Sequence, residues 1–258
     1  MSDEPVKYRV HADVAYLTLS IPERRNALSA AGIAALLQGV RQALAAEHVR
    51  FVVLTGTGST FCAGADMKEQ RARHARGEPP TTPGLLPEIL TLLWESPKPV
   101  LGRLNGHVRA GGMGLVGACD IAVATEEATF SFSEVRVGLA PAVVSVTTLP
   151  RMQPRAALEL MLTGETFSAR HAVEVGLLNA AVPAVDLDER IDRYLQMLRL
   201  AAPGAVGVTK EIVRRVPTMP LEAAFAEMTQ LSTSFFSSDE GQEGMRAFQE
   251  RRRPRWVS

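Results

Sequence analysis

Residues 105–114 read Asn-Gly-His-Val-Arg-Ala-Gly-Gly-Met-Gly, a run of small residues that follows an apolar segment. A second small-residue stretch, residues 61–66, reads Phe-Cys-Ala-Gly-Ala-Asp. Small residues let a ligand approach the backbone closely, and a helix N-terminus presents unpaired N–H groups with partial positive charge. Two such N–H groups converging on one oxygen form an oxyanion hole, whereas glycines that only make turns and tight packing bind nothing. The pattern alone leaves both interpretations open.

The sequence around these stretches alternates predicted strands with predicted helices. Residues 14–21 alternate apolar and polar side chains, which predicts a half-buried strand. Ser29 can cap a helix whose apolar residues recur at helical spacing over 33–44. Further strands are expected at 51–54, 100–104 and 121–124, and a further helix at 85–94. Strands alternating with helices predict an α/β fold with right-handed ββα or βαβ crossovers.

The second half of the chain has a different character. After Pro150 the strand signals fade, and helical stripes are expected over 187–198, 221–236 and 239–253. We therefore expect an α/β core over residues 1–195 and a helical region over 196–258, which is too small to stand alone and packs on its own core or on another subunit. Residues 71–83 lack periodicity and predict a mobile surface loop.

Composition excludes several classes of protein. Apolar residues make up 46% of the 258 residues, and 28 basic residues balance 28 acidic ones. A protein that binds nucleic acid or a membrane surface through bulk charge would carry a basic excess. The two cysteines, Cys62 and Cys119, make no disulfide framework. The N-terminal residues lack a signal-peptide pattern, and no uncharged apolar run is long enough to span a membrane, so we expect a soluble cytoplasmic protein.

Other common catalytic signatures are missing from the sequence. The five histidines show no metal-ligand spacing, so no metal is expected. Residues 56–61 follow a predicted strand and contain two glycines, but they lack the third glycine of a dinucleotide fingerprint and the Gly-Lys-Ser/Thr of a phosphate loop. No Gly-x-Ser-x-Gly elbow occurs, which argues against a hydrolase of that type.

Several motifs occur along the chain in one order. They are Pro22 with Asn26-Ala27-Leu28, Thr55-Gly56, residues 61–68, Lys98-Pro99-Val100, Asn105-Gly106 with Gly111-Gly112, Cys119-Asp120-Ile121, residues 130–138, Glu243-Gly-Met, Phe248 and Arg251-Arg-Arg-Pro254. Over nearly its whole length the chain thus resembles the crotonase superfamily, also called the enoyl-CoA hydratase/isomerase family. The resemblance implies a spiral core of ββα units with a C-terminal helical trimerisation region.

The resemblance also implies a substrate and its binding residues. Members of the family bind an acyl-CoA thioester and stabilise its enolate, with no metal and no cofactor beyond the CoA of the substrate. By motif position, the oxyanion hole consists of the backbone N–H groups of Ala65 and Gly111. The positions implied for CoA contacts are Arg24, Ala27, Ala63, Asp66, Met67, Lys68 and Arg252, with Asp66 expected mainly to hold its loop. The family forms homotrimers or homohexamers, so either assembly is expected, with no nucleic-acid or membrane partner.

The proton-transfer residues decide the reaction. Hydratases of the family carry two glutamates, and Gly114 stands at the first of these positions while Glu134 matches the second. Alone, a glutamate there would be a solvated strand-end residue; the resemblance makes Glu134 the acid/base. Enoyl-CoA hydratase is the leading expectation, because some bacterial hydratases of branched acyl-CoAs share this local pattern. A Δ3,Δ2-enoyl-CoA isomerase using Glu134 alone, or a silent acyl-CoA-binding relative, is the alternative.

Two arginines suggest a hypothesis about the substrate. Arg109 or Arg136 could pair with a free carboxylate on the acyl chain, because a guanidinium suits bidentate recognition. The competing interpretation is a surface or intersubunit salt bridge, and it is the one we favour. The terminal arginine run, residues 251–253, is likewise either a CoA contact or a solvated tail.

Overall fold

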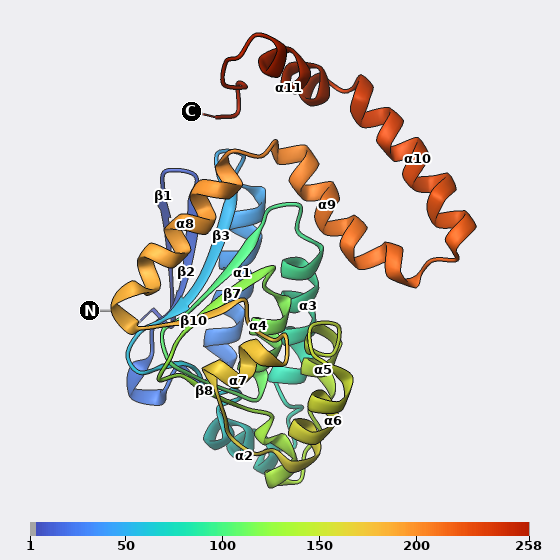
Figure 1. Cartoon of the computed structure of the whole chain (residues 1–258). Helices are drawn as coiled ribbons and strands as arrows, with labels where there is room; N and C mark the ends of the chain where they lie inside the picture. The colour runs from blue at the N-terminus through green and yellow to red at the C-terminus, as the bar shows by residue number, and fades with distance from the viewer. Residues whose placement is uncertain (1–3, 258) are drawn as a thin grey trace. The chain divides into compact units, whose positions relative to one another are not determined.

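The computed structural model describes residues 4–257, without the side chains of Thr82 and Pro83. Its backbone divides into two compact units. The first comprises the described residues up to Ser96 together with Val100–Ile191, and the second comprises Pro97–Pro99 and the residues from Asp192 onward. The first unit holds both sheets, and Figure 1 colours the whole chain by position.

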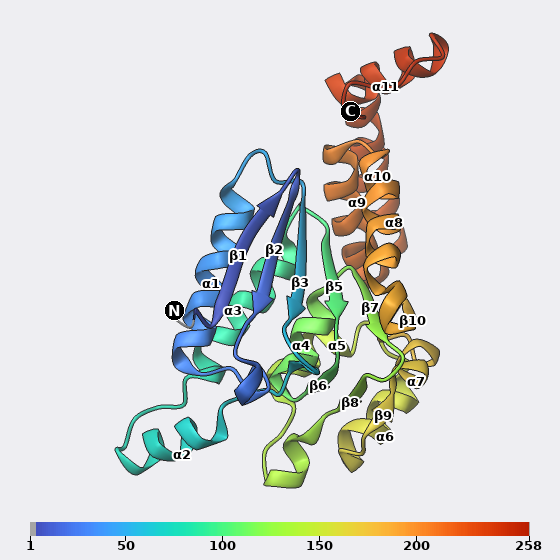
Figure 2. The same ribbon diagram turned by 90° about the vertical axis from the view of Figure 1, so that its left-hand side faces the viewer.

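The central sheet of the first unit has six strands. Their order across the sheet is β1 (Val6–His11), β2 (Val14–Leu19), β3 (Phe51–Gly56), β5 (Val100–Leu104), β7 (Ile121–Thr125) and β10 (Ala180–Val182). The β1–β2 pair is antiparallel and the other pairs are parallel. Figure 2 shows these strands side by side. Parallel neighbours need long crossovers, and the helices supply them, as the alternating sequence pattern predicts.

The first unit also contains a second, smaller sheet. It comprises β4 (Thr60–Cys62), β6 (His107–Arg109), β8 (Thr129–Ser131) and β9 (Phe167–Ser168), in that order. Each of the first three strands comes directly after a strand of the central sheet, so β3–β4, β5–β6 and β7–β8 form successive strand pairs. Repetition of this pair with an intervening helix builds the spiral of ββα units, which confirms the predicted fold class.

Three helices bury apolar residues on this framework. The helix α1 (Ala30–Ala45) begins where the sequence predicts, because the Ser29 hydroxyl accepts a hydrogen bond from the N–H of Gly32. The helix α3 (Thr82–Glu95) contains the predicted 85–94 segment and buries Leu86, Ile89 and Leu93. The helix α4 (Gly111–Ala118) is buried along its whole length, so its glycines are packing positions as well as turn positions.

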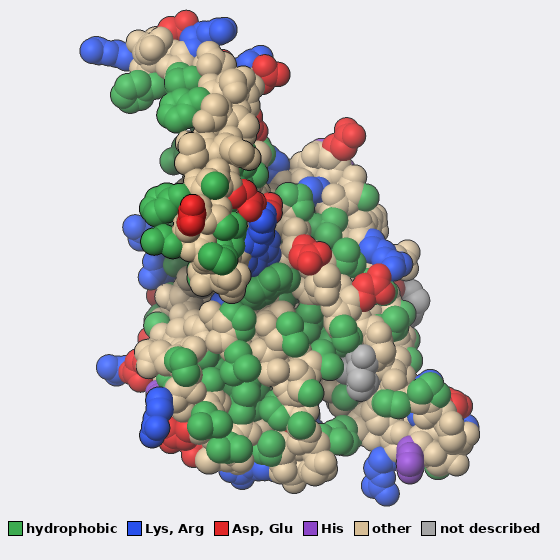
Figure 3. Space-filling model, turned by 90° about the vertical axis from the view of Figure 1, so that its right-hand side faces the viewer, with side chains coloured by type: hydrophobic (Ala, Val, Ile, Leu, Met, Phe, Trp, Pro, Cys, Tyr) green, Lys and Arg blue, Asp and Glu red, His purple; other side chains and the backbone are tan. Residues whose placement is uncertain are grey.

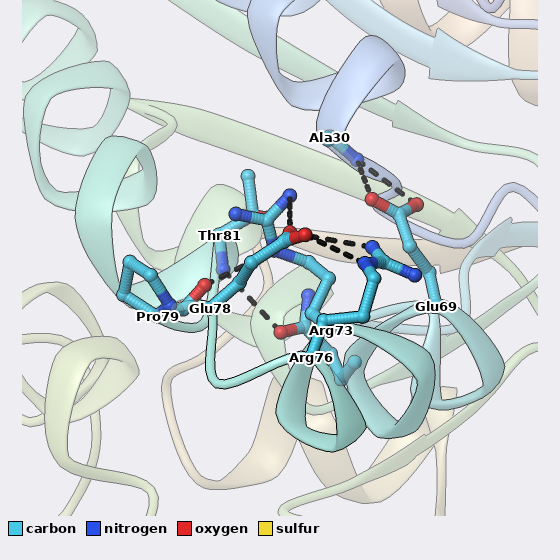
Figure 4. Close-up of polar contacts among 8 residues, drawn as sticks. Ala30, Glu69, Arg73, Arg76, Glu78, Pro79 and Thr81 are labelled. Carbon is cyan, nitrogen blue, oxygen red and sulfur yellow. Dashed lines mark hydrogen bonds and ion pairs between the residues drawn. The ribbon is translucent and has the colours of Figure 1, made fainter.

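The segment expected to be a loop over 71–83 is partly helical. The helix α2 (Met67–Ala75) runs into it, and residues 76–81 fold back onto that helix (Figure 4). Arg73 donates to the carbonyl of Pro79 over 3.0 Å, and the Arg76 guanidinium pairs with Glu78 at 2.6 Å. The loop prediction was therefore wrong for residues 71–75 and 82–83, which are helical, whereas residues 76–81 lie in no helix or strand. The helix α2 was missed because it has no apolar stripe, and capping and ion pairs define it instead.

Helices complete both units. In the first, α5 (Ala142–Thr148), α6 (Pro154–Thr163) and α7 (Ala169–Glu174) follow β8. After α8 (Leu187–Arg199), where the chain passes into the second unit, come α9 (Pro203–Arg215), α10 (Leu221–Ser237) and α11 (Asp239–Gln249), which confirms the helical pattern expected after residue 187. Figure 3 shows hydrophobic side chains on the face that carries α5 and α6, where Val146, Leu149, Leu158 and Leu162 are exposed.

Candidate active site

The backbone N–H of Ala65 is available to a ligand. Residue 65 forms a parallel bridge with Leu28, in which Leu28 donates to the carbonyl of Gly64 over 2.7 Å and accepts from the N–H of Asp66 over 3.3 Å. Because successive peptide groups of an extended chain point to opposite sides, the Ala65 N–H points away from Leu28. Within residues 4–257 this N–H has no hydrogen-bond acceptor.

The second donor lies beside the first. Gly111 is the first residue of α4, where a helix leaves its N–H groups without intrahelical partners. A Cβ atom built on Gly64 would lie 3.2 Å from the nitrogen of Gly111, so the two glycine stretches touch. Ala110 turns the chain into α4 with φ 46° and ψ −120°, a conformation that L-residues rarely adopt. The stretches that carry the N–H groups of Ala65 and Gly111 thus lie against each other, as the oxyanion-hole interpretation requires.

Asn26 holds in position the turn that leads into residues 61–66. Its buried amide accepts from the N–H of Ile21 over 2.9 Å and donates to the carbonyls of Thr57 and Thr60 over 2.9 and 2.7 Å. Asn26 has a left-handed φ of 52°, which asparagine tolerates better than most residues. Its motif was quoted in the sequence analysis, but its structural role was missed; a polar residue in a short Asn-Ala-Leu turn was the available signal.

Glu134 carries the candidate acid/base carboxyl. It lies in the short 3-10 helix η2 (Ser133–Val137), and its Oε2 is buried and has no hydrogen-bond partner among the described residues. Burial is the main cause that raises the pKa of the Glu134 carboxyl above the usual glutamate value. Three residues earlier, the Ser131 carbonyl accepts from the N–H of Ala110 over 3.2 Å. This bond ties the strand that leads to Glu134 to the turn that presents Gly111.

The position of the missing first glutamate is filled by apolar groups. A Cβ atom built on Gly114 would lie 3.1 Å from both Leu90 Cδ1 and Val144 Cγ1. The carbonyl of Gly114 accepts from the Thr147 hydroxyl over 2.9 Å, which fixes α5 against α4. A longer side chain therefore has no room at residue 114 unless α3 or α5 shifts. Of the two family positions for a glutamate, only that of Glu134 carries a carboxylate.

All the residues implied for CoA contacts except Arg252 lie around the start of α2. Asp66 is buried, caps α2 by accepting from the N–H of Glu69 over 3.1 Å, and pairs with Arg24 at 2.9 Å. Ala27 and Ala63 lie half-buried beside this turn, and Met67 and Lys68 are exposed on the first turn of α2. Asp66 thus has the loop-holding role expected for it, and Arg24 contacts it from the surface.

The two arginines considered as carboxylate partners have acceptors within the chain. Arg109 donates to the carbonyls of Val108 and Thr129 and to the Thr129 hydroxyl, over 2.6–2.8 Å. Partial burial, and to a smaller extent the nearby charge of Arg25, lower the pKa of Arg109. Arg136 is exposed and donates from Nε to the carbonyl of Thr163 over 3.0 Å. Arg109 therefore links β6 to β8.

Arg252 lies in the second unit and holds the C-terminal segment. Its guanidinium makes two bonds to the Glu243 carboxylate, 2.7 and 3.0 Å, and a third from Nε to Glu250 at 2.6 Å. Glu243 also accepts from the N–H of Arg255 over 3.0 Å. The hydrogen bond from Arg252 is the largest cause that lowers the pKa of Glu243 to about 2.

This pair predicts a pH-dependent stability. Because the pKa of Glu243 falls from an ordinary value of about 4.3 to about 2 on folding, its stabilising contribution is full above the ordinary value and is lost as the pH falls toward the folded value. We expect Glu243→Gln to lower the melting temperature at pH 7, with the difference shrinking at pH 3. Glu222→Gln, at an exposed residue of α10, is the control, and an equal difference at both pH values would contradict the assignment.

Residues 4–257 contain no group of three or more His, Cys, Asp or Glu side chains placed to hold a metal ion. None of the helices in this part of the chain has the length and hydropathy needed to cross a membrane.

Comparison with known proteins identifies the family. Residues 9–258 match the enoyl-CoA hydratase/isomerase family model. The chain is 35% identical to the mevalonyl-coenzyme A hydratase of Aspergillus fumigatus, over 93% of this chain and 90% of that protein, and 32% identical to the (E)-benzylidenesuccinyl-CoA hydratase of Thauera aromatica, over 97% and 98%. An enoyl-CoA hydratase structure from Mycobacterium smegmatis superposes with a TM-score of 0.89 and 33% identity, over 98% and 99% of the two chains. The chain therefore belongs to the enoyl-CoA hydratase/isomerase family, within the crotonase superfamily of acyl-CoA enzymes.

Proposed function

We propose that this protein is an enoyl-CoA hydratase that adds water to a 2-enoyl-CoA, with Glu134 as its single acid/base. The observation that carries the proposal is the buried, unpartnered Oε2 of Glu134, on the segment bonded to the turn that presents the Gly111 N–H. A buried carboxylate with a raised pKa is a stronger base than a solvated one. The relatives named as hydratases support this choice over the isomerase.

One carboxylate is sufficient for the whole reaction. The N–H groups of Ala65 and Gly111 hold the thioester oxygen, which polarises the conjugated double bond. Glu134 takes a proton from water as the water oxygen bonds to C3, and the electrons of the C2–C3 double bond move into the thioester to form the enolate. The protonated Glu134 then returns its proton to C2 as the enolate collapses. The product contains one added water, and Glu134 is again an unprotonated carboxylate.

The isomerase is the second candidate, and the apolar surroundings of Gly114 favour it. Leu90 and Val144 offer no group that could hold a second contact to water at that position. Moving a double bond from C3 to C2 needs only a base that removes a proton from C2 of the 3-enoyl thioester and delivers one to C4. Glu134 could carry out this transfer without any water.

CoA recognition and assembly belong to the same proposal. Lys68 and Arg24, exposed beside the Asp66 turn, are proposed to contact the anionic nucleotide portion of CoA. The apolar side chains exposed on α5 and α6 are proposed to be covered in a homotrimer or homohexamer, as such exposed patches commonly are. Arg252 is already bound to Glu243, and we propose that its principal role is to hold the C-terminal segment in position.

Product analysis tests the proposal directly. Purified protein is given a straight-chain 2-enoyl-CoA and a 3-enoyl-CoA, and the products are separated by chromatography and weighed. The hydratase adds one water to the 2-enoyl substrate. Migration of the double bond in the 3-enoyl substrate at unchanged mass, without hydration, would establish the isomerase instead. Binding of both CoA esters without turnover would overturn both and leave a silent acyl-CoA-binding protein.

A further inference from the structure

The helix α2 and the segment that joins it to α3 each contain a buried polar atom without a hydrogen-bond partner among the described residues. The Nε2 of Gln70, on α2, and the Oγ1 of Thr81, next to the start of α3, are both buried and make no hydrogen bond within the described part of the chain. The two residues are neighbours, because the Oε1 of Gln70 accepts from the N–H of Thr81 over 3.3 Å. A buried donor without an acceptor is destabilising, so such atoms are rare unless a ligand satisfies them.

The orientation of the Gln70 amide is fixed by this contact. If the amide were flipped, its NH2 group would face the N–H donor of Thr81, which is unfavourable. The free atom is therefore a donor. Thr81 stands at the N-cap of α3, where a threonine hydroxyl commonly accepts from the helix backbone, yet it makes no capping bond. Both side chains thus keep a hydrogen-bonding group that no other described residue uses.

These atoms belong to the two helices that frame the proposed oxyanion hole. The helix α2 begins at Met67, two residues after Ala65, and Gln70 lies in its second turn. The helix α3 places Leu86 and Leu90 against the donor helix: their methyl carbons would lie 3.5 and 3.1 Å from Cβ atoms built on Gly111 and Gly114. The proposed oxyanion hole thus lies next to the start of α2 through Ala65 and next to α3 through Gly111, which makes the segment joining the two helices a candidate contact for the acyl chain.

The surroundings favour an uncharged ligand group. Arg73 and Arg76, the arginines of this polar network, are both bound to Glu78, and Glu69 accepts from the N–H of Ala30 with both carboxylate oxygens (Figure 4). The same bonds anchor α2 to α1 and to its own return segment. Gln70 and Thr81 therefore offer uncharged hydrogen-bonding groups on a fixed support, and the arginines of the network are already engaged by Glu78.

We propose that Gln70 and Thr81 form a subsite for an uncharged oxygen, a hydroxyl or a keto group, on the acyl chain of the substrate. This inference rests on the proposed function and narrows its substrate class to oxygen-bearing 2-enoyl-CoA esters. The Gln70 NH2 donates to that oxygen, and the Thr81 hydroxyl makes a second bond. An unsubstituted chain leaves both groups unpaired, so it binds less well in the transition state.

The test compares three acyl-CoA probes of one chain length: trans-2-hexenoyl-CoA and its 5-hydroxy and 5-oxo derivatives. Wild-type protein should show kcat/KM at least about 10-fold higher for one of the oxygenated probes. Gln70→Met, which keeps the size of the side chain, should abolish this preference while turnover of hexenoyl-CoA stays within about 3-fold. Thr81→Val should reduce the preference in part, and Gln42→Met, at an exposed glutamine of α1, should leave it unchanged.

The outcomes separate this inference from the function it rests on. Turnover of all three probes at equal rates, unaffected by Gln70→Met, would overturn the subsite and leave the hydratase standing. No turnover of any probe by the wild-type protein would overturn the proposed function. A carboxylate-ended probe, 2-hexenedioyl-CoA, that is preferred over both oxygenated ones would overturn the assignment to an uncharged group. If Gln70→Met fails to fold, the Thr81→Val series carries the same comparison.

Discussion

Replacing Glu134 with glutamine is expected to lower kcat/KM for the 2-enoyl-CoA substrate by about 10³-fold, the range that a general acid/base contributes. The amide keeps the size of the side chain but can neither accept the proton of water nor return one to C2. No second carboxylate is placed to compensate, because Leu90 and Val144 occupy the space beside Gly114. Steady-state rates over a range of enoyl-CoA concentrations measure the loss, and unchanged affinity for CoA esters shows that binding survives.

The same substitution is expected to stabilise the protein at neutral pH. Burial raises the pKa of the Glu134 carboxyl, so the folded state disfavours its charged form. The stability of the wild-type protein therefore falls as the pH rises from the ordinary glutamate value through the raised one, while a glutamine does not titrate. The difference in melting temperature between variant and wild type should widen over this range.

The dependence of the catalytic rate on pH provides an independent measurement of the raised pKa of Glu134. Catalysis requires the Glu134 carboxylate, so the acid limb of the wild-type kcat/KM profile should lie above the ordinary glutamate pKa. Glu127→Gln, at an exposed carboxylate between β7 and β8, is the matched control and should change neither rate nor stability appreciably. A Glu134→Gln variant that keeps its activity would remove Glu134 from the mechanism.

The long elements could be predicted because their hydrophobic pattern is strong. Residues 100–104 form β5 as expected, and 121–124 form all but the last residue of β7, since mostly apolar strands inside a parallel sheet are buried on both faces and all their residues except Arg103 and Ile121 are buried. The strands β4 and β6 were not predicted, because three residues are too few to show a period. Their pairing depends on contacts between segments more than 40 residues apart in the chain.

The candidate site was only partly readable from the sequence. The small residues around Gly64 and Gly111 indicated close backbone approach, and the structure brings them together. The Gln70–Thr81 pair could not be predicted, because it depends on the return of residues 76–81 onto a helix that has no apolar stripe. The loss of the first glutamate was visible as Gly114, whereas its replacement by Leu90 and Val144 required the packing of α3 and α5.

Replacing Gly64 with alanine is expected to reduce kcat/KM by at least about 10²-fold, comparable to the loss of one oxyanion-hole donor. A Cβ atom there would lie 2.7 Å from the Cβ of Ala110 and 3.1 Å from the carbonyl oxygen of Arg109. Both contacts are too close, so the loop that carries Ala65 must move away from the turn that presents Gly111. The two N–H donors then no longer converge on one oxygen, and kcat should fall more than affinity for CoA esters.

Backbone strain must be separated from this displacement, and the chain offers a matched control. Gly64 has φ +82°, so alanine there also carries the cost of a left-handed conformation, about 1–2 kcal/mol. Gly77 has a similar φ of +71° with no atom within 4 Å of a built Cβ, so Gly77→Ala imposes the strain without the contacts. Both variants should lose stability in chemical denaturation, but Gly64→Ala alone should lose catalytic rate. If the two variants retained equal activity, the pairing of Ala65 with Gly111 as the oxyanion hole would be wrong, because displacement of one loop must weaken any site that both build.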